Sequence, residues 1–228
     1  LISGPRNIST ALMYSFRSRS DCKVIDEPFF TYFLVNSDAV HPIADEVIKT
    51  QPKDWDEVVA QIEEASSNHD VVFVKNMAHH ILEDEKFSKL DWVNLYLIRD
   101  PRQIVTSIAK VLDHPTLRDI GSKRQVELYN MNPGVVMDTN QLLIDPEKVL
   151  NELCGRLEIP YSDEMLSWEK GPKPEDGIWA PYWYKNVHTT THFKKQKSSS
   201  DPIPEHMIAL YNEAKPYFDE MFERSIKA

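Results

Sequence analysis

The opening stretch of the chain, LISGPRNISTALMYSF, constrains the fold of this 228-residue sequence more than any other segment. It begins with apolar residues typical of a strand, turns at Gly4-Pro5, and enters a helical pattern after Ser9-Thr10. The first backbone N–H groups of a helix have no partner within the helix, and the helix dipole adds partial positive charge at the same end. Strand, tight turn and helix in this order therefore predict an anion site, to which Arg6 adds a forked cation and Ser9 and Thr10 add hydroxyl donors.

Two other interpretations of this stretch are open. A Mg-ATP loop of the Walker type, GxxxxGK followed by Ser or Thr, is a poor match, because Ile8 and Ser9 stand where its second Gly and its Lys would be. A plain turn between a strand and a helix, with a Ser as the N-cap, explains the stretch as well.

The same plan of apolar strand, polar loop and helix recurs along the chain. CKVID at 22–26 and VVFV at 71–74 are typical of strands, and a helical pattern follows each of them. Strands that alternate with helices predict an α/β fold with a mostly parallel central sheet flanked by helices. The length suits a single domain over residues 1–228. The predicted helices include 8–19, 54–65, 119–131, one that begins at Asp145-Pro146 and a C-terminal helix at 205–226, and the basic patch at 194–202 is predicted to be an exposed loop.

The composition limits the classes of partner. A net charge of -10 argues against wholesale nucleic-acid binding, so an anionic ligand needs a local positive site. The sequence has no apolar run of about 18 residues or more and no signal-peptide pattern, which argues against a membrane partner. The cysteines, Cys22 and Cys154, make no disulfide framework, and we therefore predict a reducing, cytoplasmic location.

Four charged side chains lie at or just past the carboxyl ends of predicted strands: Arg6, Glu27, Lys75 and Arg99. Ligands of α/β sheets bind beside these ends. Each residue also has a simpler explanation, since acids favour the first turn of a helix, a Lys at a strand end can reach water, and an Arg can cap a carbonyl. Four such coincidences at one edge of the sheet nevertheless predict a ligand site there.

The histidines His79 and His80 and the aromatic run after Glu27 are weaker candidates. Adjacent residues on a helix or strand point apart, and no Cys or carboxylate at a suitable spacing accompanies the two histidines, so we predict no metal site. The aromatic run consists of Phe29, Phe30, Tyr32 and Phe33. These side chains can form the wall of a substrate pocket or belong to the core.

Three ordered motifs span most of the chain: PRNISTALM at 5–13, RDPRQIVTS at 99–107, and QLLIDPEKVLNELCGRLEIP at 141–160. The first resembles the 5′-phosphosulfate loop of the sulfotransferases that use 3′-phosphoadenosine-5′-phosphosulfate (PAPS). The second resembles the 3′-phosphate motif of that family, with the same Arg-to-Ser spacing, and the third resembles its later Asp-Pro and helix segment. The resemblance implies a P-loop-like fold. It is closer to the Arg-bearing branch, which includes protein-tyrosine sulfotransferases, than to the Lys-bearing cytosolic enzymes.

The same resemblance implies roles for individual residues. Glu27 would be the catalytic base, Lys75 and Arg6 would act on the sulfuryl group, and Arg99 and Ser107 would bind the 3′-phosphate. The residues assigned to the phosphosulfate loop are Pro5, Arg6, Asn7, Ile8, Ser9 and Thr10.

The chain departs from the family pattern in several places. Ile8 replaces the loop Gly, and Asn7 replaces a Ser. Met77 stands where the cytosolic branch has its catalytic His, which leaves His79 or His80 as an alternative base. The C-terminal motif of the cytosolic enzymes is missing. We expect residues 177–197 to take over the role of this motif, with Lys185 or Lys194 directed toward the nucleotide.

The reaction implied is transfer of a sulfuryl group from PAPS to a hydroxyl or amine of an acceptor, with release of 3′,5′-adenosine bisphosphate (PAP) and without a metal. A small-molecule acceptor is preferred over a peptide. Asp26 is the competing base, and alternation along the strand predicts that Asp26 and Glu27 point to opposite sides. Two other functions stay open: a P-loop nucleotide-dependent phosphotransferase with VIDE or VVMD as its acidic motif, and a non-catalytic phosphoadenosine-binding module.

Overall fold

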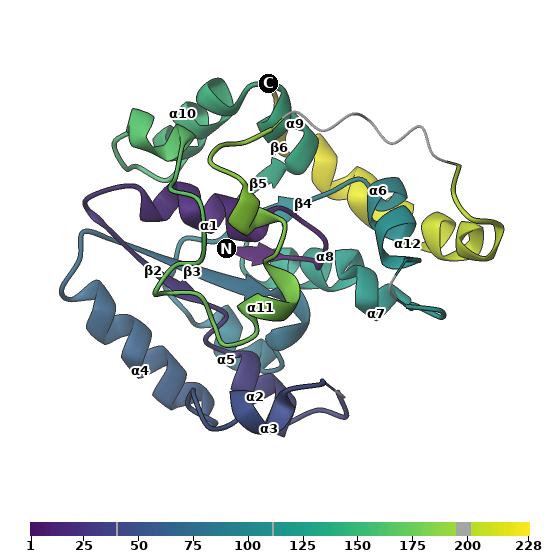
Figure 1. Ribbon diagram of the computed structural model, residues 1–228, viewed down its shortest axis with the longest axis horizontal. Coiled ribbons are helices and arrows are strands. Elements are labelled where there is room, and N and C mark those ends of the chain that lie inside the picture. The colour runs from purple at the N-terminus through teal and green to yellow at the C-terminus, as the bar shows by residue number, and fades with distance from the viewer. Residues whose placement is uncertain (40, 111, 195–201) are drawn as a thin grey trace.

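A six-stranded sheet forms the centre of the computed structural model, which describes residues 1–39, 41–110, 112–194 and 202–228 (Figure 1). All pairings within the sheet are parallel, and the strand order is β2-β3-β1-β4-β5-β6. The α/β fold with a parallel sheet is therefore confirmed. The strands are β1 (Ile2–Ser3), β2 (Cys22–Asp26), β3 (Val71–Met77), β4 (Leu95–Ile98), β5 (Val135–Asp138) and β6 (Ser225–Ile226).

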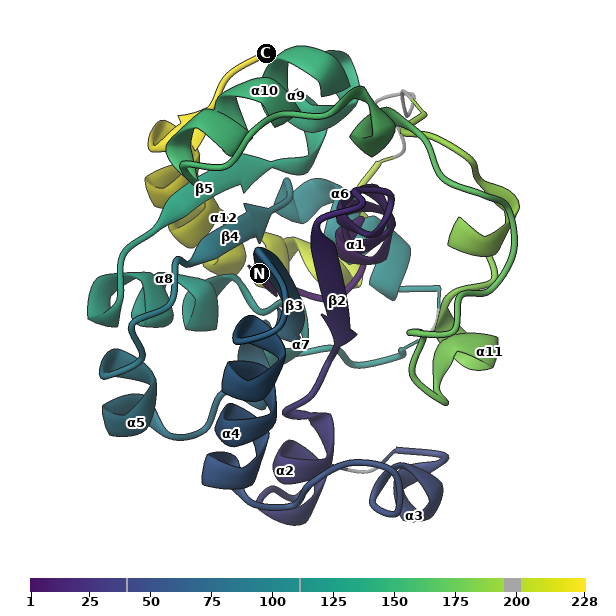
Figure 2. The same ribbon diagram turned by 90° about the vertical axis from the view of Figure 1, so that its left-hand side faces the viewer.

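Helices cover both faces of the sheet, because successive residues of each strand alternate between two apolar clusters. Leu95 and Leu97 pack on the side of α1 (Ser9–Arg17), α9 (Thr139–Ile144) and α10 (Pro146–Arg156). Tyr96 and Ile98 pack on the side of α4 (Trp55–Ser66), α8 (Ser122–Met131) and α12 (Ile208–Glu223). Figure 2 shows α1 on one side of the strands and α4 and α8 on the other. The sheet thus lies between two layers of helices, which is the arrangement typical of α/β proteins.

The order of the strands reverses at β1, and this reversal marks the part of the sheet edge where a ligand is expected to bind. The chain moves to one side of β1 for β2 and β3, and to the other side for β4, β5 and β6. In open parallel sheets the crevice for a ligand lies outside the carboxyl ends of the strands at such a reversal. The loops that follow β1, β2, β3 and β4 meet there.

Shorter helices complete the described fold. They are α2 (Phe30–Val35), α3 (Ala44–Val47), α5 (Asp84–Ser88), α6 (Pro101–Ile108), α7 (Leu117–Ile120) and α11 (Ala180–Trp183). A satellite cluster of apolar side chains joins α2 and α3 to α11. The junction of α7 and α8 touches the first loop so closely that a Cβ on Gly4 would lie 2.6 Å from the carbonyl oxygen of Ile120. Only glycine fits at that position, and the contact holds α7 beside the loop.

Some predicted boundaries differ from the structure. The helix predicted at 119–131 is broken at Gly121, whose φ of 80° ends α7 before α8 begins. The helix predicted at 205–226 is also too long, because α12 ends at Glu223 and the chain then adds β6 to the sheet. The predicted loop at 194–202 falls mainly on 195–201, which lie outside the described residues. In the described part of the chain no helix has the length and apolar character needed to cross a membrane.

Candidate active site

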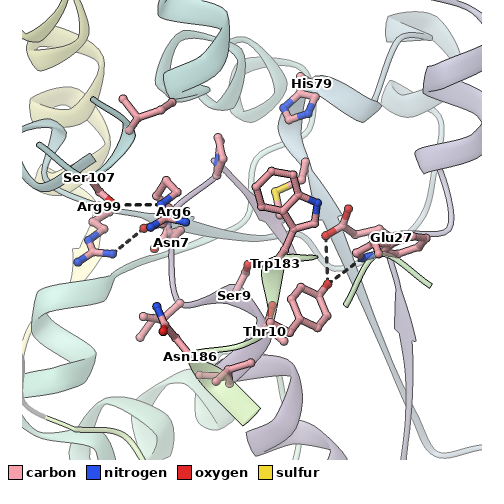
Figure 3. A pocket seen from close by; sticks show the side chains of 18 of the residues that line it. Arg6, Asn7, Ser9, Thr10, Glu27, His79, Arg99, Ser107, Trp183 and Asn186 are labelled. Carbon is pink, nitrogen blue, oxygen red and sulfur yellow. Dashed lines mark hydrogen bonds between the residues drawn. The ribbon is translucent and has the colours of Figure 1, made fainter. Parts of the chain in front are cut away.

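A cavity of about 920 Å³ opens at the predicted edge of the sheet (Figure 3). Its walls come from the loop after β1, the start of α2, the turn after β3, α6, α7 and the segment 168–194. Nine predicted site residues line it: Pro5, Arg6, Asn7, Ile8, Ser9, Thr10, Glu27, Arg99 and Ser107. The structure does not bring Lys75 or Lys185 to the cavity wall.

Two arginines from separate motifs meet at one end of the cavity, which we call the cationic end. The Nε atom of Arg6 donates to Oγ of Ser107 at 2.9 Å, and Arg99 donates to the backbone carbonyl of Arg6 at 2.5 Å. Burial and then the positive charge of Arg6 lower the pKa of Arg99. Because the two guanidinium groups repel one another, an anion bound beside them would be stabilised by both.

The start of α1 is open to a ligand. Ile8 is the N-cap, and no side chain caps the helix there, so the alternative of a turn capped by a Ser is wrong. Arg6 has a φ of 57°, a left-handed conformation that non-glycine residues rarely adopt. The side chain of Asn7 faces the protein, because it donates to the carbonyl of Leu97 at 2.7 Å and accepts from the hydroxyl of Thr139. Asn7 therefore holds the loop against β4 and α9.

A pair of carboxylates lies at the other end of the cavity, the carboxylate end. Glu27 follows β2 directly, and its backbone N–H still donates to the carbonyl of Lys75 at 2.7 Å. Its φ of 48°, however, breaks the alternation of the strand. As a result, Asp26 and Glu27 both reach the ammonium group of Lys75, and the expectation that they point to opposite sides is wrong. Of the two, only Glu27 lines the cavity.

Lys75 lies inside β3 and is completely buried, so the explanation that it reaches water is wrong. Its Nζ donates to Oδ1 of Asp26 at 2.8 Å, to Oε1 of Glu27, and to the hydroxyl of Tyr184 at 2.8 Å. An ammonium group has three donors, and these contacts occupy all of them. Burial lowers the pKa of Lys75, but the two carboxylates outweigh burial and raise it above its usual value.

Asp26 fastens the segment that covers the cavity. Its Oδ2 accepts from the hydroxyl of Tyr184 at 2.8 Å and from the backbone N–H of Gly177 at 3.0 Å. The same hydroxyl accepts from the indole N–H of Trp179 at 3.1 Å. Asp26 therefore contacts Lys75 of β3 and two residues that flank α11, Gly177 and Tyr184. These contacts hold it away from the cavity.

Glu27 keeps one oxygen for the cavity. Lys75 holds Oε1, while the nearest polar side-chain atom to Oε2 among the described contacts is Nδ1 of His80, 3.9 Å away. Burial raises the pKa of Glu27, and the charge of Asp26 adds to this against the opposing charge of Lys75. A carboxylate with a raised pKa and a free oxygen is suited to accept a proton.

His80 is buried beside Glu27, the adjacent His79 is half-buried, and lowered pKa values favour the neutral form of both rings near pH 7. Burial lowers the pKa of His79 to about 4 and that of His80 well below its usual value. Their rings lie edge to face, with centroids 4.6 Å apart. Within the described residues, no group of three or more His, Cys, Asp or Glu side chains is placed to hold a metal ion.

The aromatic run after Glu27 divides between the cavity and the core. Phe30 and Phe33 line the cavity, and the ring of Phe30 stacks on His80 with centroids 4.7 Å apart. Phe29 and Tyr32 pack instead in the cluster beneath α4. The pocket-wall and core interpretations thus each hold for half of the run.

The sequence predicts a contribution from residues 177–197 through a lysine, but it does not predict the role of Tyr184. Tyr184 lines the cavity and contacts all three members of the buried charge cluster, although it is 158 residues from Asp26. The only signal in the sequence is the density of aromatic residues in WAPYWY at 179–184. Lys185 is exposed and does not line the cavity, whereas its neighbour Asn186 and the alternative candidate Lys194 do.

Comparisons with known proteins show the family of the chain. The family model described as "Sulfotransferase domain" matches residues 1–225. Two Arabidopsis thaliana proteins, branched-chain-amino-acid aminotransferase-like proteins 1 and 2, are 36% and 34% identical to this chain over 92% of its length. The chain spans 40% of the length of these curated relatives.

Solved structures share the fold at low sequence identity. The sulfotransferase from Alicyclobacillus acidocaldarius has a TM-score of 0.56 at 11% identity, and covers 99% of this chain and 96% of its own. The sulfotransferase domain from the curacin biosynthetic pathway has a TM-score of 0.54 at 14% identity, and covers 93% of this chain and 95% of its own. With the family model matched along nearly the whole sequence, the chain belongs to the sulfotransferase domain family.

Proposed function

We propose that this chain transfers a sulfuryl group from PAPS to a hydroxyl or amine of a small-molecule acceptor and releases PAP. The observation that carries the proposal is a single cavity that joins the cationic end, with Arg6, Ser107 and Arg99, to the Oε2 atom of Glu27. A donor with two anionic groups fits the first end, and an acceptor that must lose a proton fits the second.

At the cationic end, the uncapped start of α1 and Arg6 are assigned to the 5′-phosphosulfate. Ser9 and Thr10 line the cavity beside them and supply hydroxyl donors. Arg99 and Ser107 are assigned to the 3′-phosphate, whose charge relieves the repulsion between the two arginines. During transfer, negative charge grows on the oxygen that bridges sulfur and phosphorus, and fixed donors at that point lower the barrier.

At the carboxylate end, Oε2 of Glu27 takes the proton of the acceptor as its oxygen or nitrogen forms the new bond to sulfur. The bond between sulfur and the bridging oxygen breaks, and its electron pair leaves with PAP. Lys75 acts through Glu27 in this proposal, because its three donors are used within the buried cluster. Lys75 is thus a positioning residue in this proposal, in place of the direct contact with the sulfuryl group that the family resemblance implied.

Turnover with PAPS tests the proposal. The protein is incubated with PAPS and a panel of alcohols, phenols and amines, and PAP release is measured by liquid chromatography together with the mass gain of the acceptor. We expect acceptor-dependent PAP release that Glu27→Gln lowers strongly. Binding of PAP without release from PAPS for any acceptor would favour a non-catalytic module, and Mg-dependent turnover of a nucleoside triphosphate would favour a phosphotransferase.

A further inference from the structure

A third arginine also lines the cavity. Arg118, on α7, has its guanidinium carbon 5.5 Å from the centroid of the Phe33 ring. Among the described residues no carboxylate lies within ion-pair distance of it. The adjacent carboxylate of Asp119 is engaged instead by the backbone N–H and hydroxyl of Thr116, at 2.7 and 2.8 Å. In a chain of net charge -10, a cation with no described acidic partner in a cavity wall is a candidate for ligand recognition.

A row of neutral rings connects Arg118 to Glu27. The ring of Phe33 lies 5.1 Å from that of His79 and 5.0 Å from that of His80, centroid to centroid. Nδ1 of His80 is in turn 3.9 Å from Oε2 of Glu27, and it is buried without a hydrogen-bond partner in the described structure. This part of the cavity, which we call the acceptor half, thus has the carboxylate of Glu27 at its inner end, uncharged rings along its wall and the guanidinium of Arg118 beyond them, next to Asp119, whose carboxylate Thr116 engages.

We propose that this half of the cavity is a subsite for a hydroxy- or amino-carboxylic acid with an apolar spacer. Its carboxylate binds Arg118, its spacer lies along Phe33 and the two histidines, and its hydroxyl or amine reaches Glu27. The inference rests on the proposed function of the same site and names its acceptor class.

The charges at the two ends also fix the direction in which such an acceptor binds. A carboxylate placed beside Glu27 would be repelled, whereas Arg118 offers the planar fork that matches a carboxylate. The neutral histidines neither attract nor repel the spacer by charge, and Arg118 itself contributes to keeping His79 neutral by lowering its pKa, after burial. The end of the acceptor that receives the sulfuryl group is therefore selected by charge.

Calorimetry with a matched pair of probes tests the subsite. The probes are 3-(4-hydroxyphenyl)propanoate and its methyl ester, titrated into protein saturated with PAP. We expect the acid to bind roughly tenfold tighter than the ester, which corresponds to one charge-assisted contact. Arg118→Ala should remove this preference, and Arg118→Lys should keep part of it. Arg102→Ala is the control, because its guanidinium makes the same kind of contact with the ring of Tyr211 but lies outside the cavity wall.

The outcomes separate the subsite from the reaction. Equal binding of acid and ester, no binding of either, or a large loss of PAP affinity in Arg118→Ala would each overturn the subsite, the last by assigning Arg118 to the nucleotide. PAP release from PAPS with both probes at equal efficiency would overturn the subsite and leave sulfuryl transfer standing. An acid that binds through Arg118 but never releases PAP would leave the subsite standing and overturn sulfuryl transfer.

Discussion

The two ends of the cavity are built in opposite ways. At the cationic end, Arg6 is exposed and its partner is a neutral serine, so positive charge is left for a ligand. At the carboxylate end, Asp26, Glu27 and Lys75 are buried and satisfy one another, with Tyr184 closing the cluster. The first arrangement suits the binding of a diffusible anion, and the second suits a base whose position must not change.

Lys75→Met should produce the largest effect, on stability. The change leaves two buried carboxylates without their shared cation, which costs on the order of 3–5 kcal/mol of unfolding free energy. Urea unfolding followed by circular dichroism measures it. Lys86→Met is the control, because its ion pair with Asp56 is exposed and such pairs contribute little. Equal losses in both variants would mean that the buried cluster does not hold the carboxylate end together.

Glu27→Gln should lower turnover by roughly a hundredfold or more and leave PAP affinity nearly unchanged. The amide keeps the shape of the side chain but cannot take a proton. Since burial raises the pKa of Glu27 above its usual value, the wild-type rate should fall as the pH drops through that raised pKa, where the carboxylate becomes protonated. Rates of PAP release against pH measure both effects. An unchanged acid limb in Glu27→Gln would assign the limb, and the base, to another group.

The contrast between the two ends also explains what the sequence could predict. The cationic end comes from two contiguous motifs, so the sequence and its family resemblance together predict that Arg6, Arg99 and Ser107 lie at one site, and all three line the cavity. The carboxylate end depends on a left-handed backbone at Glu27, which strand alternation cannot reveal. It also depends on Tyr184, whose contact with Asp26 spans 158 residues from an irregular segment.

The strands of the sheet differ in the same way in how much local pattern they carry. Strands with four or more residues, such as β2 and β4, carry enough apolar residues to be recognised. β6 has two residues and follows a helix directly, so no pattern distinguishes it from the end of that helix. Its place in the sheet is decided by pairing with β5, a contact that only the assembled structure supplies.

Arg99→Ala should weaken PAP binding roughly ten- to hundredfold, because a charge-assisted contact to a phosphate is lost. Adenosine 5′-monophosphate lacks the 3′-phosphate, so its weaker binding should change little in this variant. Calorimetry with both nucleotides measures the difference. Equal affinities of the wild-type protein for the two would remove the assignment of Arg99 and Ser107 to the 3′-phosphate and leave the cationic end without its second phosphate.

Tyr184→Phe should have the smallest effect, and it tests whether the covering segment tunes the carboxylate end. The hydroxyl lies 3.3 Å from Oε1 of Glu27 and favours its charged form, so its loss should raise the pKa of Glu27 further. Asp26 keeps its contacts with Lys75 and with the backbone of Gly177, which should limit the loss of stability to about 1 kcal/mol. We expect turnover near neutral pH to fall by roughly threefold to tenfold, with the acid limb of the pH profile displaced upward.

If Tyr184 has a purely structural role, Tyr184→Phe should lower stability and leave the acid limb of the pH profile in place. If it positions Glu27, the acid limb should move as well. Trp179→Phe is the matched control, because it removes the indole donor to the same hydroxyl but leaves the hydroxyl itself beside Glu27. If the limb moves equally in both variants, the hydroxyl of Tyr184 is not what tunes Glu27, and the covering segment acts by packing alone. If the acid limb moves only in Tyr184→Phe, the hydroxyl of Tyr184 sets the basicity of Glu27, although the two residues are far apart in the sequence.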